Sequence, residues 1–443
     1  MKTKFVLLAS LFVVSIGFSQ KKWTLKECVD HALENNITVK QNELNVQLAD
    51  LEVKRTKGNF LPNLNASTGG NLSFGSTFDP VSQNRVSNTL FGGSVGLNSQ
   101  VNIFNGFRNL NTYKQAQLGV ERSKLTLETI QNDISLSVVN GYLNILFAKE
   151  NLGVAKVQAD ISAKQVQAAK DRFEAGIIPK GDLLNVESTA ANDAQNVIIQ
   201  ENALTIALLN LSQTLQIPTE GFDIETVEVG TPLAVLLYDS SDIVYQKALT
   251  TQPQIQNAKL GIKDAEFNIE IAKSGFLPTI GASASASTNY VYDLNLMPGF
   301  QNVKLFEQLD NNLGYGIGFN VSIPIFNRTQ TKTNVDRQFV NLEVSKVNLE
   351  NEKLQLQQRI EQAFVDAKAA VKAYEAAKVS LEAQQEAFKN AQESFNLGAM
   401  TLFDFDLVRN RLVNAESTLI RNKFDFVFKT KVLQFFYGEL NLD

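Results

Sequence analysis

Residues 313–326 have the sequence Leu-Gly-Tyr-Gly-Ile-Gly-Phe-Asn-Val-Ser-Ile-Pro-Ile-Phe. Every odd position holds a large apolar side chain, and the even positions up to 324 hold Gly, Asn, Ser or Pro. Successive side chains of a β-strand point to opposite faces, so this alternation predicts a strand near 312–326. Three further stretches, near 63–78, 90–104 and 279–292, alternate in the same way, and none of the four stretches contains an ionised side chain.

These strands fit two environments. A soluble sandwich buries the apolar face and hydrates the other, whereas a membrane barrel turns the apolar face to lipid and the polar face to water. Soluble strands usually carry Lys, Glu or Arg on the wet face, but here that face carries Ser, Gly and Asn. The stretches are also longer than the usual strand of about five or six residues. The pattern therefore favours a membrane barrel over a sandwich.

Four strands cannot close such a barrel by themselves, because the smallest membrane barrels have about eight. Open edges in lipid leave backbone groups unpaired, at about several kcal/mol for each group. Several copies of the chain must then share one barrel. A dimer gives about eight strands and a trimer about twelve, and the strand pattern does not choose between them.

The order of elements occurs twice along the chain. A helix, two strands, a very long helix, a tight turn and another helix are expected within residues 20–216 and again within 242–443. Between these two repeats, 217–241 contains several Pro and Gly residues and is expected to be an irregular connecting segment. Three matched pairs of segments carry the repeat: Phe60-Leu61-Pro62 with Phe276-Leu277-Pro278, Phe104-Asn105 with Phe326-Asn327, and Phe173-x-x-Gly176 with Phe395-x-x-Gly398.

The longest expected helices, 107–175 and 328–397, carry heptad patterns. At 1.5 Å per residue, about 70 residues give a helix of roughly 105 Å, which is too long for a globular core. Large and small side chains alternate along one seam, which is typical of a coiled coil. The remaining helices are expected near 24–58, 180–216, 242–273 and 402–438. The seam residues include Val138, Ile145, Leu152, Ala148 and Ala155 in the first half, and Ile360, Ala367, Tyr374, Ala363 and Ala370 in the second.

The first residues have the features of an export signal. Lys2 and Lys4 precede an apolar run, Phe5–Phe18, which is shorter than the roughly 20 residues that span a bilayer. Small residues before Gln20 suit a signal peptidase, so residues 1–19 are expected to be a signal peptide. The alternative is a retained membrane anchor.

The composition argues against several classes of protein. With 41 basic and 46 acidic residues the net charge is −5, and no basic cluster points to nucleic acid. His31 is the sole histidine and Cys28 the sole cysteine, so a His-rich metal site and an internal disulfide are both excluded. No Gly-rich phosphate loop is present. We therefore expect neither a cofactor nor a metal, and we name no catalytic residue.

Taken together, these features resemble the TolC family of outer membrane efflux proteins. The resemblance covers essentially the mature chain and rests on the repeat, the Leu-Pro pairs, the Phe-Asn strand exits and the two turns that contain Gly176 and Gly398. It implies an α+β membrane protein: a homotrimer with a twelve-stranded barrel in outer-membrane lipid and a periplasmic tunnel of coiled helices. It further implies docking onto a periplasmic adaptor (membrane fusion protein) and an inner-membrane pump, for efflux or type I secretion.

The resemblance also places two kinds of residue at the tunnel tip. The residues at and after the two glycines are expected to meet the adaptor. Acidic residues can narrow the entrance, and the family position six residues after the second glycine is Asp404. A second family acid would fall at Leu407, but this chain has Asp406 instead, and Asp182 follows the first glycine. The expected adaptor-docking residues are Gly176, Ile177, Ile178, Gly398, Ala399, Met400 and Thr401.

A simpler explanation exists for the tip acids. Thr401-x-x-Asp404 has the spacing of a capping box, and an acidic residue in a first helical turn complements the helix dipole. Asp182 holds the equivalent place after Pro179. Capping and gating are both compatible with the sequence.

The sequence can be interpreted in terms of three functions. The first is a passive exit duct driven by its partners, and it accounts for both the strands and the heptads. The second is a structural coiled-coil protein of the periplasm or cell surface, which leaves the charge-free strands unexplained. The third, an enzyme with scattered carboxylates, has no site that we can name. The sequence does not identify the cargo.

Overall fold

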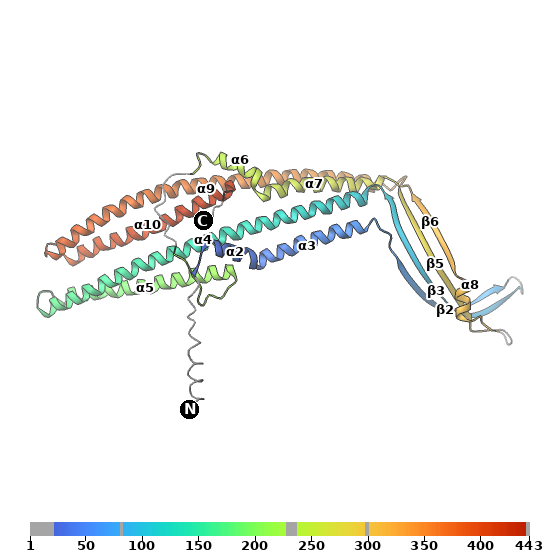
Figure 1. Ribbon diagram of the computed structural model, residues 1–443, viewed down its shortest axis with the longest axis horizontal. Helices are drawn as coiled ribbons and strands as arrows, with labels where there is room; N and C mark the ends of the chain where they lie inside the picture. Colours follow the sequence, from blue (N-terminus) through green and yellow to red (C-terminus); the bar gives the residue numbers. More distant parts are fainter. Residues whose placement is uncertain (1–21, 80–82, 227–236, 297–300, 440–443) are drawn as a thin grey trace, which may run out of the picture. The chain divides into compact units, whose positions relative to one another are not determined.

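The computed structural model describes residues 22–79, 83–226, 237–296 and 301–439 (Figure 1). The expected signal peptide, residues 1–19, lies outside these ranges and stays a prediction.

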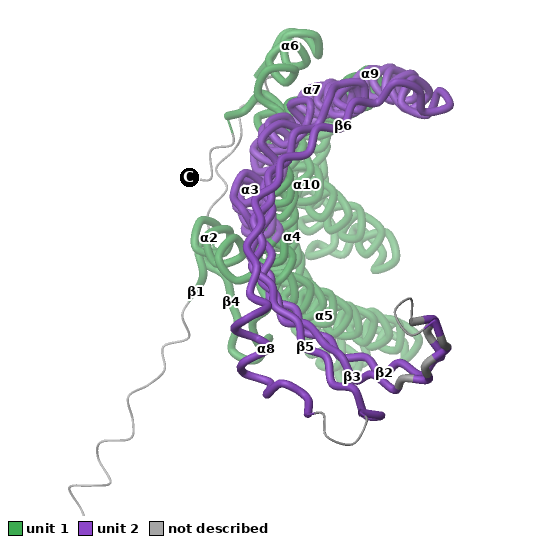
Figure 2. Tube along the Cα trace, turned by 90° about the vertical axis from the view of Figure 1, so that its right-hand side faces the viewer, with its two compact units in different colours: residues 1–44, 125–256, 350–443 green, residues 45–124, 257–349 purple. Residues whose placement is uncertain are grey.

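The chain divides into two compact units, which Figure 2 shows in different colours. Unit 1 comprises residues 1–44, 125–256 and 350–443, and unit 2 comprises residues 45–124 and 257–349. Each unit therefore takes residues from both halves of the sequence repeat.

Unit 2 contains a four-stranded antiparallel sheet with the order β2-β3-β5-β6. Its strands are β2 (Asn65–Asp79), β3 (Asn84–Asn105), β5 (Thr279–Asp293) and β6 (Gly314–Ser322). The predicted alternation is present, since large apolar side chains such as Phe319 and Tyr315 are exposed on one face. Neither β2 nor β6 has a second strand partner in the described chain, so both outer edges of the sheet are open.

Two of the strands differ in length from the prediction. β3 begins six residues before the predicted start at 90, because it pairs with β2 along the whole of that strand, from Asn65↔Asn98 to Asp79↔Asn84. β6 ends at Ser322, before the predicted end at 326, because Pro324 has no N–H to donate to a sheet. Ionised residues occur only toward the outer strand ends, at Asp79, Arg85 and Asp293.

A tyrosine crosses the apolar face of this sheet over glycines. Tyr290 lies so close to Gly93 that a Cβ atom on Gly93 would be 2.6 Å from the tyrosine hydroxyl oxygen and 2.6 Å from the carbonyl oxygen of Gly69. The Tyr290 ring also contacts Phe91, with 5.9 Å between the ring centroids. Gly93 is therefore required by close packing within the sheet.

Unit 1 is built from helices that pack along the predicted heptad seams. Its main helices are α2 (Leu25–Asn35), α5 (Lys180–Leu215), α6 (Ser241–Thr251), α10 (Leu402–Tyr437) and the unit 1 parts of α4 (Arg108–Glu174) and α9 (Gln330–Asn396). The helices α4 and α9 each have 67 residues, about 100 Å. Val138, Ile145, Ile360 and Ala367 are all at most 1% exposed, so the predicted seams are confirmed.

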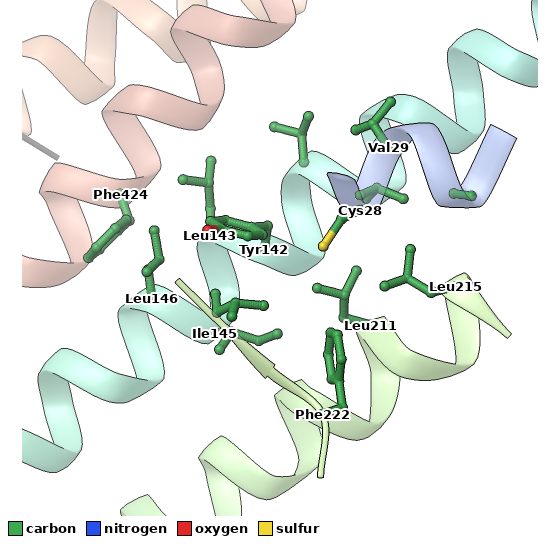
Figure 3. Packing of buried hydrophobic residues seen from close by; sticks show 14 residues of the cluster. Cys28, Val29, Tyr142, Leu143, Ile145, Leu146, Leu211, Leu215, Phe222 and Phe424 are labelled. Carbon is green, nitrogen blue, oxygen red and sulfur yellow. The ribbon is translucent and has the colours of Figure 1, made fainter. Parts of the chain in front are cut away.

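The main core of unit 1 gathers around the middle of α4 (Figure 3). Tyr142 and Ile145 of α4 meet Cys28 of α2 and Leu211 of α5 there. The hydroxyl of Tyr142 donates hydrogen bonds to the carbonyl oxygens of Trp23 and Glu225, at 3.3 and 2.8 Å. Trp23 ends β1 (Lys22–Trp23) and Glu225 follows β4 (Asp223–Ile224), and these two strands form a small parallel sheet that the sequence did not predict.

Two predicted helices are interrupted. The expected helix 24–58 is α2 followed by α3 (Ile37–Gly58), and the expected helix 242–273 is α6 followed by α7 (Pro253–Lys273). Asn36 is extended, and its side-chain oxygen accepts a hydrogen bond from the Thr38 N–H, at 2.9 Å. Gln252 is extended because it precedes Pro253, which disfavours a helical conformation at that position.

Among the helices that the structure describes, none is both long enough and apolar enough to cross a bilayer.

Gly93 gives a direct test of this sheet packing. Gly93→Val is expected to destabilise the protein by about 1–3 kcal/mol, because the new methyl groups collide with Tyr290 and with fixed backbone. The matched control is Gly75→Val on β2, where an added Cβ meets no atom within 4 Å. Thermal loss of β-sheet circular dichroism in detergent measures the effect. Equal melting temperatures for the two variants would contradict the packing described here.

Candidate functional site

The candidate site lies at one end of unit 1, where α4 turns into α5 and α9 turns into α10. Gly176 and Gly398 both adopt the left-handed conformation, with φ of +72° and +73°. The two turns close by the same pair of backbone hydrogen bonds, as in a Schellman motif. These bonds run from Gly176 N to Phe173 O, from Ile177 N to Arg172 O, from Gly398 N to Phe395 O, and from Ala399 N to Ser394 O.

The surface of the two turns is apolar and exposed. Ile177 is 71% exposed, Leu397 is 84% exposed and Phe403 is 78% exposed. Gly176, Gly398, Ala399 and Thr401 are also exposed, whereas Ile178 and Met400 are partly covered. An exposed group of large apolar side chains at the end of a helical hairpin is typical of a protein interaction surface.

The aspartates nearest the turns lie in first helical turns. In α10, the Thr401 hydroxyl accepts a hydrogen bond from the Asp404 N–H at 3.2 Å and donates one to Asp404 Oδ2 at 2.6 Å. Asp182 occupies the first turn of α5, after the N-cap residue Pro179, which offers no side-chain cap. The structure therefore shows Asp404 in a capping arrangement.

Asp406 has a different environment, because it belongs to a buried cluster around Arg409. Arg409 is 1% exposed, although arginine is rarely buried. Its Nη2 atom lies 3.3 Å from Asp193 Oδ2 and 3.6 Å from Asp406 Oδ1. Its Nη1 atom donates to Ser162 Oγ at 2.9 Å and to Gln165 Oε1 at 3.1 Å. Arg409 of α10 thus contacts both α4 and α5.

This Arg409 cluster is closed by further contacts and keeps some polar atoms unpaired. Ser162 donates a hydrogen bond to Asp193, and the Thr189 hydroxyl lies 3.5 Å from Asp406 Oδ2. Among the described atoms, Arg409 Nε and Asp406 Oδ1 have no hydrogen-bond partner. Burial raises the pKa of Asp406, repulsion from Asp193 adds to the rise, and the Arg409 charge opposes it. Two partly exposed carboxylates therefore share one buried cation.

Closer to the turns, aromatic contacts lie within the α9–α10 hairpin and between this hairpin and α4. The ring of Phe395 in α9 stacks on Phe405 in α10, with 4.7 Å between centroids, and Phe388 packs on Phe405 at 5.6 Å. The guanidinium of Arg172 in α4 lies 5.9 Å from the centroid of Phe395. A cation over a ring face is attracted by the ring quadrupole, so this contact also ties α4 to α9.

The site residues predicted from the sequence are only partly brought together. Asp406 lies in the Arg409 cluster, whereas Asp404 and Asp182 lie in first turns outside it. Sequence reasoning missed Arg409 and Asp193. A signal for Arg409 was present, because it falls between Phe405 and Leu412 on the buried stripe of α10, where an arginine is anomalous.

The sequence of this chain is similar to those of known outer membrane proteins. A family model described as outer membrane efflux protein matches residues 28–215 and 244–426. The outer membrane efflux protein BepC of Brucella suis is 23% identical over 434 residues, which cover 95% of this chain and 86% of that protein.

Solved structures show the same fold. The CmeC outer membrane channel of Campylobacter jejuni superposes with a TM-score of 0.76 at 19% identity, covering 94% of this chain and 86% of that one. The open state of the MtrE outer membrane channel of Neisseria gonorrhoeae gives a TM-score of 0.72 at 18% identity, covering 95% and 90%. The predicted fold class is therefore confirmed: a protomer that gives four strands to a trimeric outer-membrane barrel and long helices to a periplasmic tunnel.

These matches confirm the predicted family, the outer-membrane location with a periplasmic helical domain, and the homotrimer with its adaptor and pump. The chain belongs to the outer membrane efflux protein family, and it is an exit duct of the outer membrane for efflux or secretion.

Proposed function

We propose that this chain is a passive duct without catalytic activity, and that the Arg409 cluster holds its periplasmic entrance closed. The observation that carries the proposal is the burial of Arg409 between two carboxylates, where it ties α10 to α4 and α5. The exposed residues of the two turns dock the adaptor, and Asp404 and Asp182 stabilise the helix starts beside them.

The Arg409 cluster can act as a latch, that is, a contact that holds the α9–α10 hairpin against α4 and α5 and can be released. It can be released because water can replace its polar contacts. Burying an ion pair costs about as much in desolvation as it returns in attraction, so such a pair adds little net stability. When the α9–α10 hairpin moves away from α4 and α5, water solvates Arg409, Asp193 and Asp406. An apolar contact of the same size would instead lose its hydrophobic stabilisation on separation. The latch therefore gives a defined closed arrangement that an adaptor can open with modest work.

The tip surface supports the docking part of the proposal. Ile177 and Leu397 project from turns that rigid glycine caps hold in place. Exposed apolar side chains on a fixed backbone lose little conformational entropy when a partner covers them. A structure of this fold is described as an open state, which supports an entrance that moves.

Removing the latch arginine is the first test. Arg409→Ser leaves the partly exposed carboxylates of Asp193 and Asp406 close together without a cation between them, so that they repel each other. The closed arrangement is then disfavoured, and the conductance of the purified protein in planar bilayers is expected to rise severalfold.

Two variants serve as controls for that measurement. Arg411→Ser removes an exposed arginine from the same helix, and Asp404→Ala removes only the hydrogen bond that the Thr401 hydroxyl donates to the Asp404 carboxylate. Both are expected to keep the conductance of the original chain. If Arg409→Ser also keeps it, the Arg409 cluster does not hold the entrance.

The latch should also respond to pH. The raised pKa of Asp406 means that the closed arrangement binds its proton more tightly than water-exposed Asp406 would. Lowering the pH from the raised pKa of Asp406 toward the ordinary aspartate pKa of about 3.9 therefore stabilises the closed arrangement. This stabilisation is lost as the pH rises through the raised pKa. Conductance is expected to fall as the pH is lowered toward about 4.

A neutral side chain should remove that response. Asp406→Asn leaves Arg409 balanced by Asp193 alone, so the closed arrangement should be favoured at every pH, and the slope of conductance against pH should flatten. Asp171→Asn, on the exposed surface of α4, is the matched control and should keep the slope. An unchanged slope in Asp406→Asn would exclude Asp406 as the titrating group.

Adaptor docking is tested at the first turn. Ile177→Asp places a charge on a side chain that an adaptor must desolvate, so recovery of the adaptor after cross-linking in cells should fall severalfold. Ile198→Asp changes an isoleucine of similar exposure, 66%, on α5 away from the turn, and should leave recovery unchanged. Equal recovery with both variants would argue against docking through Ile177.

A further inference from the structure

The outer half of β5 is not paired with a strand. β6 pairs with β5 only from Thr279 to Ser287, although β5 continues to Asp293. Beyond Ser287 the backbone groups of β5 on that edge bond to side-chain amides instead. Asn289 O accepts from Asn312 Nδ2 at 2.7 Å, Val291 N donates to Gln308 Oε1 at 2.9 Å, and Asp293 exchanges two bonds of 2.9 Å with the Asn302 amide.

These amides come from a segment that contains the short helix α8 (Leu305–Asn311), which the sequence did not predict. The Thr288 hydroxyl donates to Leu309 O at 2.6 Å, which holds α8 beside β5 (Figure 1). Carboxamide side chains have the same donor and acceptor groups as a peptide bond. Residues 302–312 therefore cover the edge of β5 where β6 would otherwise continue.

The other edge of the sheet is longer than β6. β2 has 15 residues and β6 has nine. Both strands adjoin helices at their inner ends, Asn65 and Ser322, so β6 of one copy can pair with only the inner part of β2 in the next copy. On its outward edge, the outer part of β2 then has no strand beside it and lies beyond the end of β6, at the level of α8.

Exposed aromatic side chains gather on both sides of this junction. Phe306 of α8 is 83% exposed, while the neighbouring Leu305, Gln308 and Leu309 are partly buried toward β5. On the outer part of β2, Phe74 is 75% exposed and Phe78 is 58% exposed. Large exposed apolar side chains on both sides of a junction between copies can pack against one another.

We propose that α8 of one copy packs against the outer part of β2 in the next copy, with Phe306 on Phe74 and Phe78, and so closes the extracellular rim of the barrel. We assign the partner of α8 to a second copy because of where α8 lies. In the trimer β6 of one copy pairs with the inner part of β2 in the next, and α8 lies on the same sheet edge as β6, directly beyond the end of that strand. The inference rests on the trimeric barrel and is independent of the latch at Arg409.

Disulfide trapping tests the contact. Within one chain, Phe74 and α8 are separated by three strand positions, about 14 Å, which exceeds the reach of a disulfide, about 7 Å between Cα atoms. Phe306→Cys combined with Phe74→Cys, or with Phe78→Cys, should therefore give covalent dimers and trimers on non-reducing gels after mild oxidation. Cys28 is fully buried and can stay in place.

The control pairs Phe306→Cys with Ser87→Cys. Ser87 lies opposite Ser76 on β3, at the same level and on the same face but one strand further from the neighbouring copy. Size-exclusion chromatography first confirms that each variant is a trimer. Cross-linking at Phe74 or Phe78 that exceeds the Ser87 pair severalfold supports the proposal. No cross-linking at either phenylalanine, or equal yields with Ser87, overturns it and leaves the latch untouched.

Discussion

The outward edges of β2 and β6 carry backbone N–H and C=O groups that no other described strand of the chain pairs. In hydrocarbon each such group would cost about several kcal/mol, and only closure of the sheet satisfies all of them. The charge-free alternation of the strands places these edges in lipid, so one copy of the chain is structurally incomplete. Trimerisation and the shared barrel follow from that requirement.

The two ends of the duct are stabilised by different kinds of interaction. In the sheet, backbone hydrogen bonds and close contacts such as Tyr290 over Gly93 have no substitute in a membrane, so this part must stay closed around its circumference. At the periplasmic tip, the contacts of Arg409 with Asp193 and Asp406 can be exchanged for water. A duct needs both properties, because its barrel must never separate while its entrance must open. Helices α4 and α9 each contribute residues to both units.

Much of the fold could be predicted because its signals are local and periodic. Period-two alternation located all four strands of the sheet, and heptads located seam residues such as Ile145 and Ile360, both of which are fully buried. The expected continuous helix 242–273 was wrong at Gln252, although Pro253 is a sequence signal for a break there. The break at Asn36 depends on a side-chain hydrogen bond that carries no clear sequence signature. The pairing of β1 with β4 could not be predicted. Each strand has only two residues, too few to show a periodic pattern, and the two strands are about two hundred positions apart in the sequence.

The candidate site was harder to predict than the fold. Spacing from the glycines led to Asp404 and Asp406 but gave no reason to separate a cap from a buried cluster, since that depends on which face of α10 meets α4. Asp193 has no motif that links it to Arg409, and only the packing of α5 against α10 brings them together. Helix α8 was missed because Leu305–Asn311 is short and has no full amphipathic period. The amide side chains in and around α8 form hydrogen bonds with the edge of β5. These contacts depend on the tertiary structure and leave no local pattern in the sequence.

The copy number of the membrane-extracted protein tests the central claim most directly. Native mass spectrometry of the full chain, released from detergent micelles, is expected to give a single species with the mass of three mature subunits. A folded species of one subunit that stays in solution without detergent would contradict the account, because its strand edges and apolar face would then be satisfied within one chain.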